Sequence, residues 1–193
     1  FIPLLVYLMD KKFLDYGGGP AVLASAIKAK GADSRLFDIS PDMRMRAGDR
    51  IGRENVYKKV EDIPHDYFDF IICNLVLCIV PEKEVVNIVH NLYSEVKKGG
   101  FVYVGFCNPL IFDIPESKID FRMQTKHKYE DNHNYKKIKK EGNYEIVESH
   151  RPIEWYVQIF KDNGLNLVDT IFTPEYELNG RKIKDFSIFK LSK

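Results

Sequence analysis

The chain has 193 residues, of which 45% are hydrophobic and 30% charged, and its net charge at pH 7 is +1. This length is sufficient to bury a substantial core and predicts a single domain spanning residues 1–193. The near-neutral charge does not indicate a nucleic-acid or membrane partner, and no apolar run approaches the roughly 18 residues of a membrane span.

The first elements follow the order strand, glycine turn, helix, strand. Residues 1–9 place leucines on one helical face and predict the end of a helix; they are too short and lack the basic leader of a signal peptide. A predicted strand over 12–15 leads into the turn Gly17-Gly18-Gly19-Pro20. A helix over 21–30 and a strand over 34–37 follow. Glycines in such a turn allow a ligand to approach the backbone.

An acidic residue closes each of these two strands. Asp38 follows the second strand and suits the hydroxyls of a bound ribose. Asp15 precedes the glycine turn, where a carboxylate would repel a pyrophosphate at the helix N-terminus. Val22 stands where the NAD fingerprint requires glycine or alanine. The residues therefore favour S-adenosylmethionine, which carries a sulfonium and an ammonium group, over NAD.

The later elements continue the alternation of strands and helices. Ser40 and Pro41 suit the N-cap and first residue of a short helix over 41–48. Asn179-Gly180 predicts a hairpin turn between the last two strands. The pattern predicts a doubly wound, mostly parallel α/β sheet with helices on both faces. Further strands are expected over 56–59, 68–74, 101–106, 165–172 and 185–191, and further helices over 82–97 and 152–162.

Residues 109–150 interrupt this alternation. The segment is polar, aromatic and basic, with six lysines between Lys126 and Lys140. An insertion after the fifth strand lies over the carboxyl edge of the sheet, where ligands bind in such folds. We therefore expect a substrate lid; the alternative is a solvated excursion without a function.

The three cysteines predict a reducing environment. Cys73, Cys78 and Cys107 are odd in number, and two of them fall within apolar strand patterns. Buried, reduced thiols in a cytoplasmic protein are the expectation. Neither cysteines nor histidines show the paired short spacing of a zinc site, so no metal is expected.

Five stretches between about residues 10 and 108 resemble, in family order, the motifs of the class I (Rossmann-like) S-adenosylmethionine-dependent methyltransferases. The resemblance implies a seven-stranded sheet whose last strand is antiparallel. One departure is Ala21, which replaces the last glycine of the first motif. The matching stretches are Leu14-Asp15-Tyr16-Gly17-Gly18-Gly19-Pro20, Phe37-Asp38-Ile39-Ser40-Pro41-Asp42-Met43, Val60-Glu61-Asp62-Ile63-Pro64, Phe68-Asp69-Phe70-Ile71-Ile72-Cys73-Asn74 and Val96-Lys97-Lys98-Gly99-Gly100-Phe101-Val102.

The same resemblance implies contacts with the amino acid and ribose parts of the cofactor. The backbone of Gly17 and Gly19 would contact the amino acid portion, and Asp15 would orient its ammonium group. Asp38 would accept hydrogen bonds from the ribose hydroxyls. Residues just past the fourth strand would line the methyl group and the sulfur, namely Asn74 and Leu75.

The adenine contacts are also implied by the resemblance. Ile39 and Met43 would pack on the ring, although simple core packing is an equal alternative for Met43. Asp62 would accept a hydrogen bond from the adenine amino group. The backbone N–H of Ile63 would bond a ring nitrogen.

The acceptor side of the site is less defined, because methyl transfer requires positioning and exclusion of water rather than a protein nucleophile. A hydroxyl acceptor gains from a general base, for which His150 is the candidate; a structural cap is the alternative. Cys78 stands where relatives often have histidine. The lid residues expected to contact the acceptor are His127, Tyr129, His133, Tyr135 and Arg151, with structural roles as the alternative for the two histidines.

These observations favour an enzyme that methylates an N or O atom of a small molecule with S-adenosylmethionine, leaving S-adenosylhomocysteine. An RNA-modifying methyltransferase is a second hypothesis, because the lysines of residues 136–140 would suit phosphates. Nearby acids dilute that patch, so a nucleic-acid partner is not favoured. A non-catalytic S-adenosylmethionine-binding protein is a third, suggested only by Ala21 and Cys78.

Overall fold

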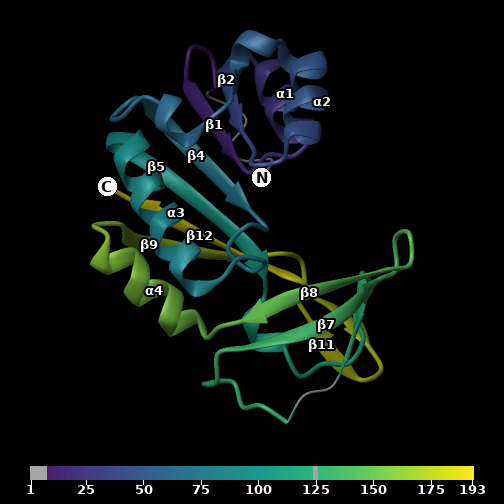
Figure 1. The fold of residues 1–193 in the computed structure, drawn as a ribbon. Coiled ribbons are helices and arrows are strands. Elements are labelled where there is room, and N and C mark those ends of the chain that lie inside the picture. Colours follow the sequence, from purple (N-terminus) through teal and green to yellow (C-terminus); the bar gives the residue numbers. More distant parts are fainter. Residues whose placement is uncertain (1–7, 124–125) are drawn as a thin grey trace.

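The structure is a computed structural model that describes residues 8–123 and 126–193. Seven strands form one sheet in the order β3-β2-β1-β4-β5-β12-β9 (Figure 1). β12 runs antiparallel to both of its neighbours, and the pairs from β3 through β5 are parallel. The predicted doubly wound sheet with an antiparallel last strand is therefore confirmed. Its strands are β1 (Lys12–Tyr16), β2 (Asp33–Phe37), β3 (Val56–Tyr57), β4 (Phe68–Asn74), β5 (Val96–Cys107), β9 (Asn166–Phe172) and β12 (Phe186–Ser192).

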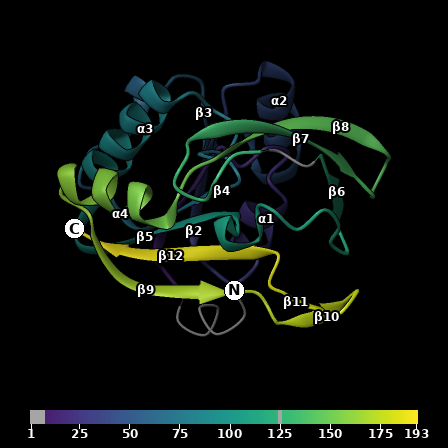
Figure 2. The same ribbon diagram turned by 90° about the horizontal axis from the view of Figure 1, so that it is seen from below.

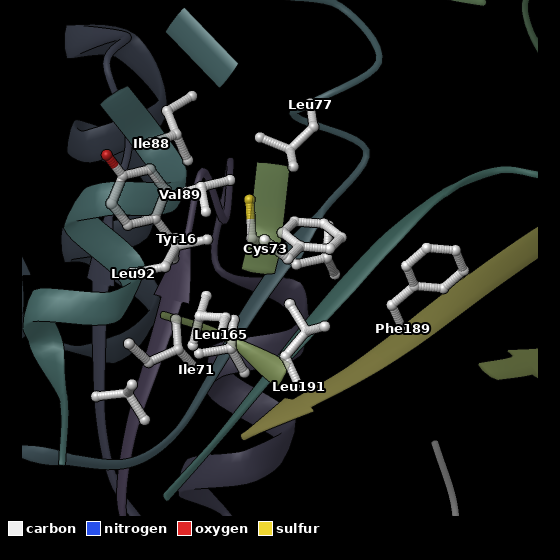
Figure 3. Packing of buried hydrophobic residues seen from close by; sticks show 14 of the residues in the cluster. Tyr16, Ile71, Cys73, Leu77, Ile88, Val89, Leu92, Leu165, Phe189 and Leu191 are labelled. Atoms are coloured by element: carbon white, nitrogen blue, oxygen red, sulfur yellow. The ribbon is translucent and has the colours of Figure 1, made fainter. Parts of the chain in front are cut away.

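Helices cover both faces of this sheet because the central strands are apolar on both sides. One core cluster lies between the sheet and α3 and α4, where Ile71, Val89, Leu92 and Leu165 are buried together (Figure 3). The other lies under α1 and α2, with Phe13 and Ile72 from the opposite strand face. The α-helices of the described residues are α1 (Val22–Lys28), α2 (Pro41–Ile51), α3 (Glu82–Glu95) and α4 (Ile153–Asp162).

Several element boundaries differ from expectation: α2 continues to Ile51, and β5 already begins at Val96. The expected helix end over 1–9 lies mostly outside the described residues, and residues 8–10 lead through a turn into β1. β3 ends at Tyr57, and a short 3-10 turn, Val60–Asp62, follows it. The helix expected over 82–97 ends at Glu95, because Val96 is extended, fully buried and paired with Phe68 of β4.

The segment 109–150 folds into a sheet of its own. After a 3-10 turn over Pro109–Ile111, the strands β6 (Asp120–Arg122), β7 (His133–Lys139) and β8 (Tyr144–His150) form an antiparallel sheet in that order. Figure 1 shows this lid sheet extending beside the carboxyl ends of β4 and β5. Alternate residues of β7 and β8 face opposite sides: Tyr135 and Glu148 are buried on the inner face, whereas Val147 is exposed on the outer face.

The predicted turn at Asn179-Gly180 is present, with positive φ angles of 51° and 71° as a two-residue hairpin turn requires. It does not join the two long strands β9 and β12 as expected, but two short strands that were not predicted, β10 (Tyr176–Leu178) and β11 (Arg181–Ile183). These form a separate ribbon between β9 and β12 (Figure 2).

Candidate functional site

The glycine turn after β1 leaves one position open. A Cβ on Gly17 would overlap Val76, and one on Gly18 would overlap the Asp15 carboxyl group, so neither place admits a side chain. Gly17 also has a φ of 72° and donates its N–H to the Phe37 carbonyl at 2.7 Å. A Cβ on Gly19 would meet nothing within 4 Å. A ligand can therefore approach the backbone at Gly19.

Asp15 is a buried carboxyl group without a full set of partners. It is 3% exposed, and its Oδ2 atom has no hydrogen-bond partner among the described residues. Burial, reinforced by the Asp38 carboxylate, raises the pKa of Asp15 to about 7. A cationic ligand group beside Asp15 would satisfy this oxygen and favour its ionised form. This observation fits a cofactor that carries an ammonium group.

Asp38 links the ends of β1 and β2. Its Oδ2 atom accepts the Gly19 N–H at 2.9 Å and its Oδ1 atom accepts the Ser40 N–H at 2.8 Å. Each carboxylate oxygen has a further lone pair for a ribose hydroxyl. Next to it, Ile39 is 85% exposed and Met43 is half-buried, so Ile39 offers an apolar surface beside this carboxylate.

The loop after β4 completes this side of the site. The Asn74 side chain lies over Gly105, where a Cβ would overlap its Oδ1 atom. Leu75 has a φ of 59° and donates its N–H to the Gly105 carbonyl at 2.7 Å. Val76 then fills the space next to Gly17. A left-handed, non-glycine residue is strained, and such strain concentrates at functional sites.

The residues expected to form hydrogen bonds with the adenine form hydrogen bonds with the backbone of their own turn. Asp62 is exposed and accepts the Lys59 N–H at 3.3 Å. The Ile63 N–H donates to the Val60 carbonyl at 3.1 Å, and its side chain is buried in the core. Among the described residues, no hydrogen bond connects this turn with the glycine turn.

His150 ends β8 inside a cluster of rings. Its Nε2 atom lies 2.7 Å from the Tyr129 carbonyl oxygen, and its ring centroid is 4.4 Å from that of Phe112 and 5.0 Å from that of His133. A carbonyl only accepts, so this contact places the proton of the neutral ring on Nε2 and the lone pair on Nδ1. Burial lowers the pKa of His150. The ring is therefore held as a neutral imidazole.

Of the other expected lid residues, Tyr129 and His133 lie beside the His150 ring, with ring centroids 5.5 and 5.0 Å from it. His127 stacks on His133 with centroids 4.4 Å apart. The Tyr129 hydroxyl donates to Glu154 at 3.0 Å and accepts the Ile153 N–H at 2.9 Å. Tyr135 is turned to the inner face of the lid sheet, where its hydroxyl donates to Glu148 at 2.7 Å.

Arg151 contacts main-chain atoms of the β4–α3 loop. Its side chain is 3% exposed. Nη1 donates to the Leu77 carbonyl at 2.8 Å and Nη2 to the Val80 carbonyl at 2.7 Å. These bonds occupy both terminal nitrogens, although the sequence suggested a contact with the acceptor.

A cavity of about 380 Å³ lies between that loop and the lid sheet. Glu82, at the start of α3, closes one side by accepting a hydrogen bond from Asn132 at 2.7 Å. Sequence reasoning missed this part of the site because β7 and β8 were not predicted: β7 has Lys137 on its buried side, so it shows no apolar–polar alternation. The lining residues are Ile79, Val80, Pro81, Glu82, Asn132, His133, Asn134, Val147, Ser149, His150 and Arg151.

A buried ionic network also escaped prediction. Lys137 is fully buried on the inner face, where it pairs with Glu148 and lies 3.4 Å from Asp120. Its Nζ atom is 2.9 Å from the Cys107 sulfur at the end of β5. Among the described residues, no group of three or more His, Cys, Asp or Glu side chains is arranged to hold a metal ion.

Residues 7–170 match a protein family described as a methyltransferase domain. No curated protein sequence matches the chain. Similar solved structures include an S-adenosylmethionine-dependent methyltransferase from Mesorhizobium loti, with 15% identity over 99% of this chain and 96% of that one and a TM-score of 0.71. Another, an S-adenosylmethionine-dependent methyltransferase from Archaeoglobus fulgidus, has 15% identity over 100% of this chain and 90% of that one, with a TM-score of 0.66.

A third similar structure is the 1,6-didemethyltoxoflavin-N1-methyltransferase of Burkholderia thailandensis, determined with 1,6-didemethyltoxoflavin and S-adenosylhomocysteine bound. It has 10% identity over 99% of this chain and 76% of that one, with a TM-score of 0.63. At such identities the structural likeness establishes the shared fold. None of the helices in the described ranges is long and apolar enough to cross a membrane.

Proposed function

Because this chain belongs to the class I S-adenosylmethionine-dependent methyltransferases, we propose that it methylates a nitrogen or oxygen atom of a small-molecule acceptor. Its cofactor is S-adenosylmethionine, which supplies an electrophilic methyl group on a sulfonium sulfur. The protein's part is to bind the two reactants, align them and exclude water.

The cofactor roles proposed for the residues follow from their placement. Asp15 faces the ammonium group, which supplies the partner that its Oδ2 atom lacks within the described chain. Gly19 leaves room for the amino acid portion beside Gly17. Asp38 accepts from the ribose hydroxyls while its backbone donors hold the carboxylate in place.

The remaining cofactor roles concern the adenine and the methyl group. Ile39 and Met43 cover the ring, and Asp62 is exposed for its amino group. The Ile63 N–H must give up its bond to Val60 in order to reach a ring nitrogen. The residues proposed beside the methyl group and sulfur are Asn74 and Leu75.

The cavity between the β4–α3 loop and the lid is the observation that carries the acceptor proposal. Its volume of about 380 Å³ lies in the range of small-ligand pockets. It is lined from Ile79 onward by the same loop whose first residues reach the glycine turn. The 1,6-didemethyltoxoflavin bound to the Burkholderia thailandensis neighbour supports this size class.

His150 is proposed as the base for a hydroxyl acceptor, with His127, Tyr129, His133, Tyr135 and Arg151 forming the surrounding lid. A neutral imidazole with its tautomer set by the Tyr129 carbonyl is suited to accept a proton at Nδ1. Its position on the cavity wall supports this role. An amine acceptor that is already neutral would not need the base.

The lysine run does not favour the RNA hypothesis. Lys136 pairs with Glu145 at 2.8 Å, and Lys140 pairs with Glu116 at 2.8 Å. Lys137 is buried, and Lys139 lies 3.5 Å from Asp120. Lysines that are already paired with acids have less charge to offer phosphates.

The three cysteines are unpaired and buried, which supports a cytoplasmic location.

The test is turnover with a metabolite panel, read as formation of S-adenosylhomocysteine, in the wild type and in Val147→Trp. Val147 is 52% exposed and lines the cavity, so an indole there should fill it and lower turnover at least tenfold. Affinity for S-adenosylhomocysteine should stay within about twofold. Val168→Trp is the matched control, because Val168 is 54% exposed on β9 and does not line the cavity.

Two results would contradict the proposal. Full turnover by Val147→Trp on the identified acceptor would place the acceptor elsewhere. If the enzyme methylates RNA and methylates no metabolite of the panel, the hypothesis of an RNA-modifying methyltransferase would be favoured.

A further inference from the structure

We propose that Arg151 is a positioning residue for the cofactor site. It holds the β4–α3 loop, residues 75–81, in the shape that keeps Val76 against Gly17, directly after Asn74 and Leu75. The inference rests on the cofactor site and is independent of the identity of the acceptor.

The contacts of Arg151 converge on one end of this loop. Its guanidinium group bridges the carbonyls of Leu77 and Val80 with bonds of 2.8 and 2.7 Å. Between them, the Cys78 carbonyl accepts the backbone N–H of Ser149 at 2.7 Å. The loop is therefore fastened to the end of β8 at three carbonyls. A planar fork can bond two carbonyls at once, which a lysine ammonium group does less well.

The guanidinium group is itself held in place from the opposite side. It lies over the Trp155 ring, 5.2 Å from the centroid, and its Nη1 atom is 3.4 Å from the Tyr156 hydroxyl. Both residues belong to α4. Because the side chain is 3% exposed, these bonds face little competition from water.

The other end of the loop carries strain. Leu75 has a φ of 59°, a conformation that costs on the order of 1–3 kcal/mol in a non-glycine residue. Val76, the next residue, fills the space beside Gly17. A strained loop keeps its shape only when its surroundings fix it, and Arg151 supplies that fixation at the far end. If the fork is lost, Leu75 can relax and Val76 can leave the glycine turn.

The decisive variant is Arg151→Lys, which keeps the charge and removes the fork. Calorimetric titration with S-adenosylhomocysteine should show affinity about tenfold weaker than that of the wild type. Hydrogen exchange in the ligand-free protein should accelerate at the amides of residues 75–79. This second readout separates positioning from a direct contact with the ligand, because no ligand is present.

Tyr156→Phe is the control, because it removes one neighbour of the guanidinium group and leaves the two loop bonds. Its affinity should remain within about twofold of the wild type. If Arg151→Lys does not fold, Trp155→Leu replaces it, since it retains the fork but removes the ring beneath it; affinity should fall about threefold. Unchanged affinity and unchanged exchange at residues 75–79 in a folded variant, even with a lower melting temperature, would overturn the proposal.

Discussion

Ala21 is the N-cap of α1 and has a backbone conformation that suits glycine. Its φ is 61°, and its side chain is fully buried, at the place where the first motif of the family ends in glycine. An L-residue with a Cβ pays roughly 1–2 kcal/mol for the left-handed region. The missing glycine is therefore a local cost to stability, and the backbone still forms the turn.

Ala21→Gly should stabilise the protein by about 1 kcal/mol, because it removes the Cβ penalty at positive φ. Urea unfolding of the variant measures the gain. Ala24→Gly is the matched control inside α1, where the same exchange should cost about 1 kcal/mol. A loss of stability at both positions would contradict the strain at Ala21.

If Asp15 binds the ammonium group as proposed, its raised pKa should make cofactor binding depend on pH. The carboxyl group titrates at about 7 in the free protein, and its ionised form is the one that attracts an ammonium group. Below pH 7 a proton must leave before binding, so affinity should fall by up to about tenfold for each pH unit. Calorimetry with S-adenosylhomocysteine between about pH 5.5 and 8 measures this slope.

The Asp15→Asn variant should bind S-adenosylhomocysteine weakly, and its affinity should lose most of this pH dependence. Asp49→Asn is the control, since the Asp49 side chain is 67% exposed on α2 and should leave the slope unchanged. A slope retained in Asp15→Asn would assign the titration to another group.

At the scale of elements, the lid sheet depends on charges buried between it and the main sheet. Lys137 of β7 pairs with Glu148 of β8 beneath the lid and contacts Cys107 at the end of β5. Removing one partner of a buried pair leaves the other charge uncompensated, at a cost of about 3–5 kcal/mol. The inner face of the lid is therefore sensitive to single substitutions.

Lys137→Met should lower the free energy of unfolding by about 3 kcal/mol or more, and adding Glu148→Leu should restore part of it. Urea unfolding of the single and double variants gives the coupling. Lys136→Met is the matched control on the same strand, because Lys136 and Glu145 form an exposed pair that should contribute less than about 1 kcal/mol. Equal losses at the two lysines would contradict the buried pair.

The same pair explains why the lid strands were not predicted. β4 is an apolar run and the helices show regular apolar spacing, so both were recognisable from the sequence. β7 places Lys137 on its inner face, and a lysine there reads as a surface residue until Glu148 is known to lie beside it. Tertiary pairing, rather than hydrophobicity, defines this strand.

The candidate site likewise contains residues whose placement could be predicted from the sequence and residues whose partners could not. The placement of Asp15, Gly17 and Asp38 at one edge was predictable, because parallel strands end at the same edge of the sheet. Arg151 was expected at the acceptor, but its partners are the main-chain carbonyls of Leu77 and Val80. Backbone partners have no sequence signature, so only the fold reveals them.

At the scale of the whole molecule, the lid sheet contacts the main sheet at the carboxyl edge of the latter. The Ser149 N–H binds the Cys78 carbonyl, and Lys137 reaches Cys107, so the lid touches the chain just after β4 and at the end of β5. Both strands run towards the lid sheet (Figure 1), and the loop that follows β4 lines the proposed acceptor cavity. Substitutions in the lid are therefore expected to change turnover more readily than they change the packing of the distant core.

The stability of the whole molecule should fall as the pH rises, because Glu95 is buried at the end of α3. It is 2% exposed, its Oε2 atom lacks a hydrogen-bond partner in the described chain, and burial raises its pKa from 4.5 to about 8. The folded state thus binds the proton more tightly than the unfolded state. The resulting stability is complete below pH 4.5 and is lost as the pH rises towards 8.

Glu95→Gln tests this, since the amide cannot ionise. Asp15 is present in both proteins, so the difference between their curves isolates Glu95. In urea unfolding the variant should match the wild type near pH 5 and exceed it near pH 8.5 by on the order of 3 kcal/mol. Glu84→Gln, on the exposed side of the same helix, should follow the wild-type curve. If the Glu95→Gln and wild-type curves stay parallel from pH 5 to 8.5, Glu95 is ionised in the folded protein and its burial is compensated by contacts that form only around the charged group.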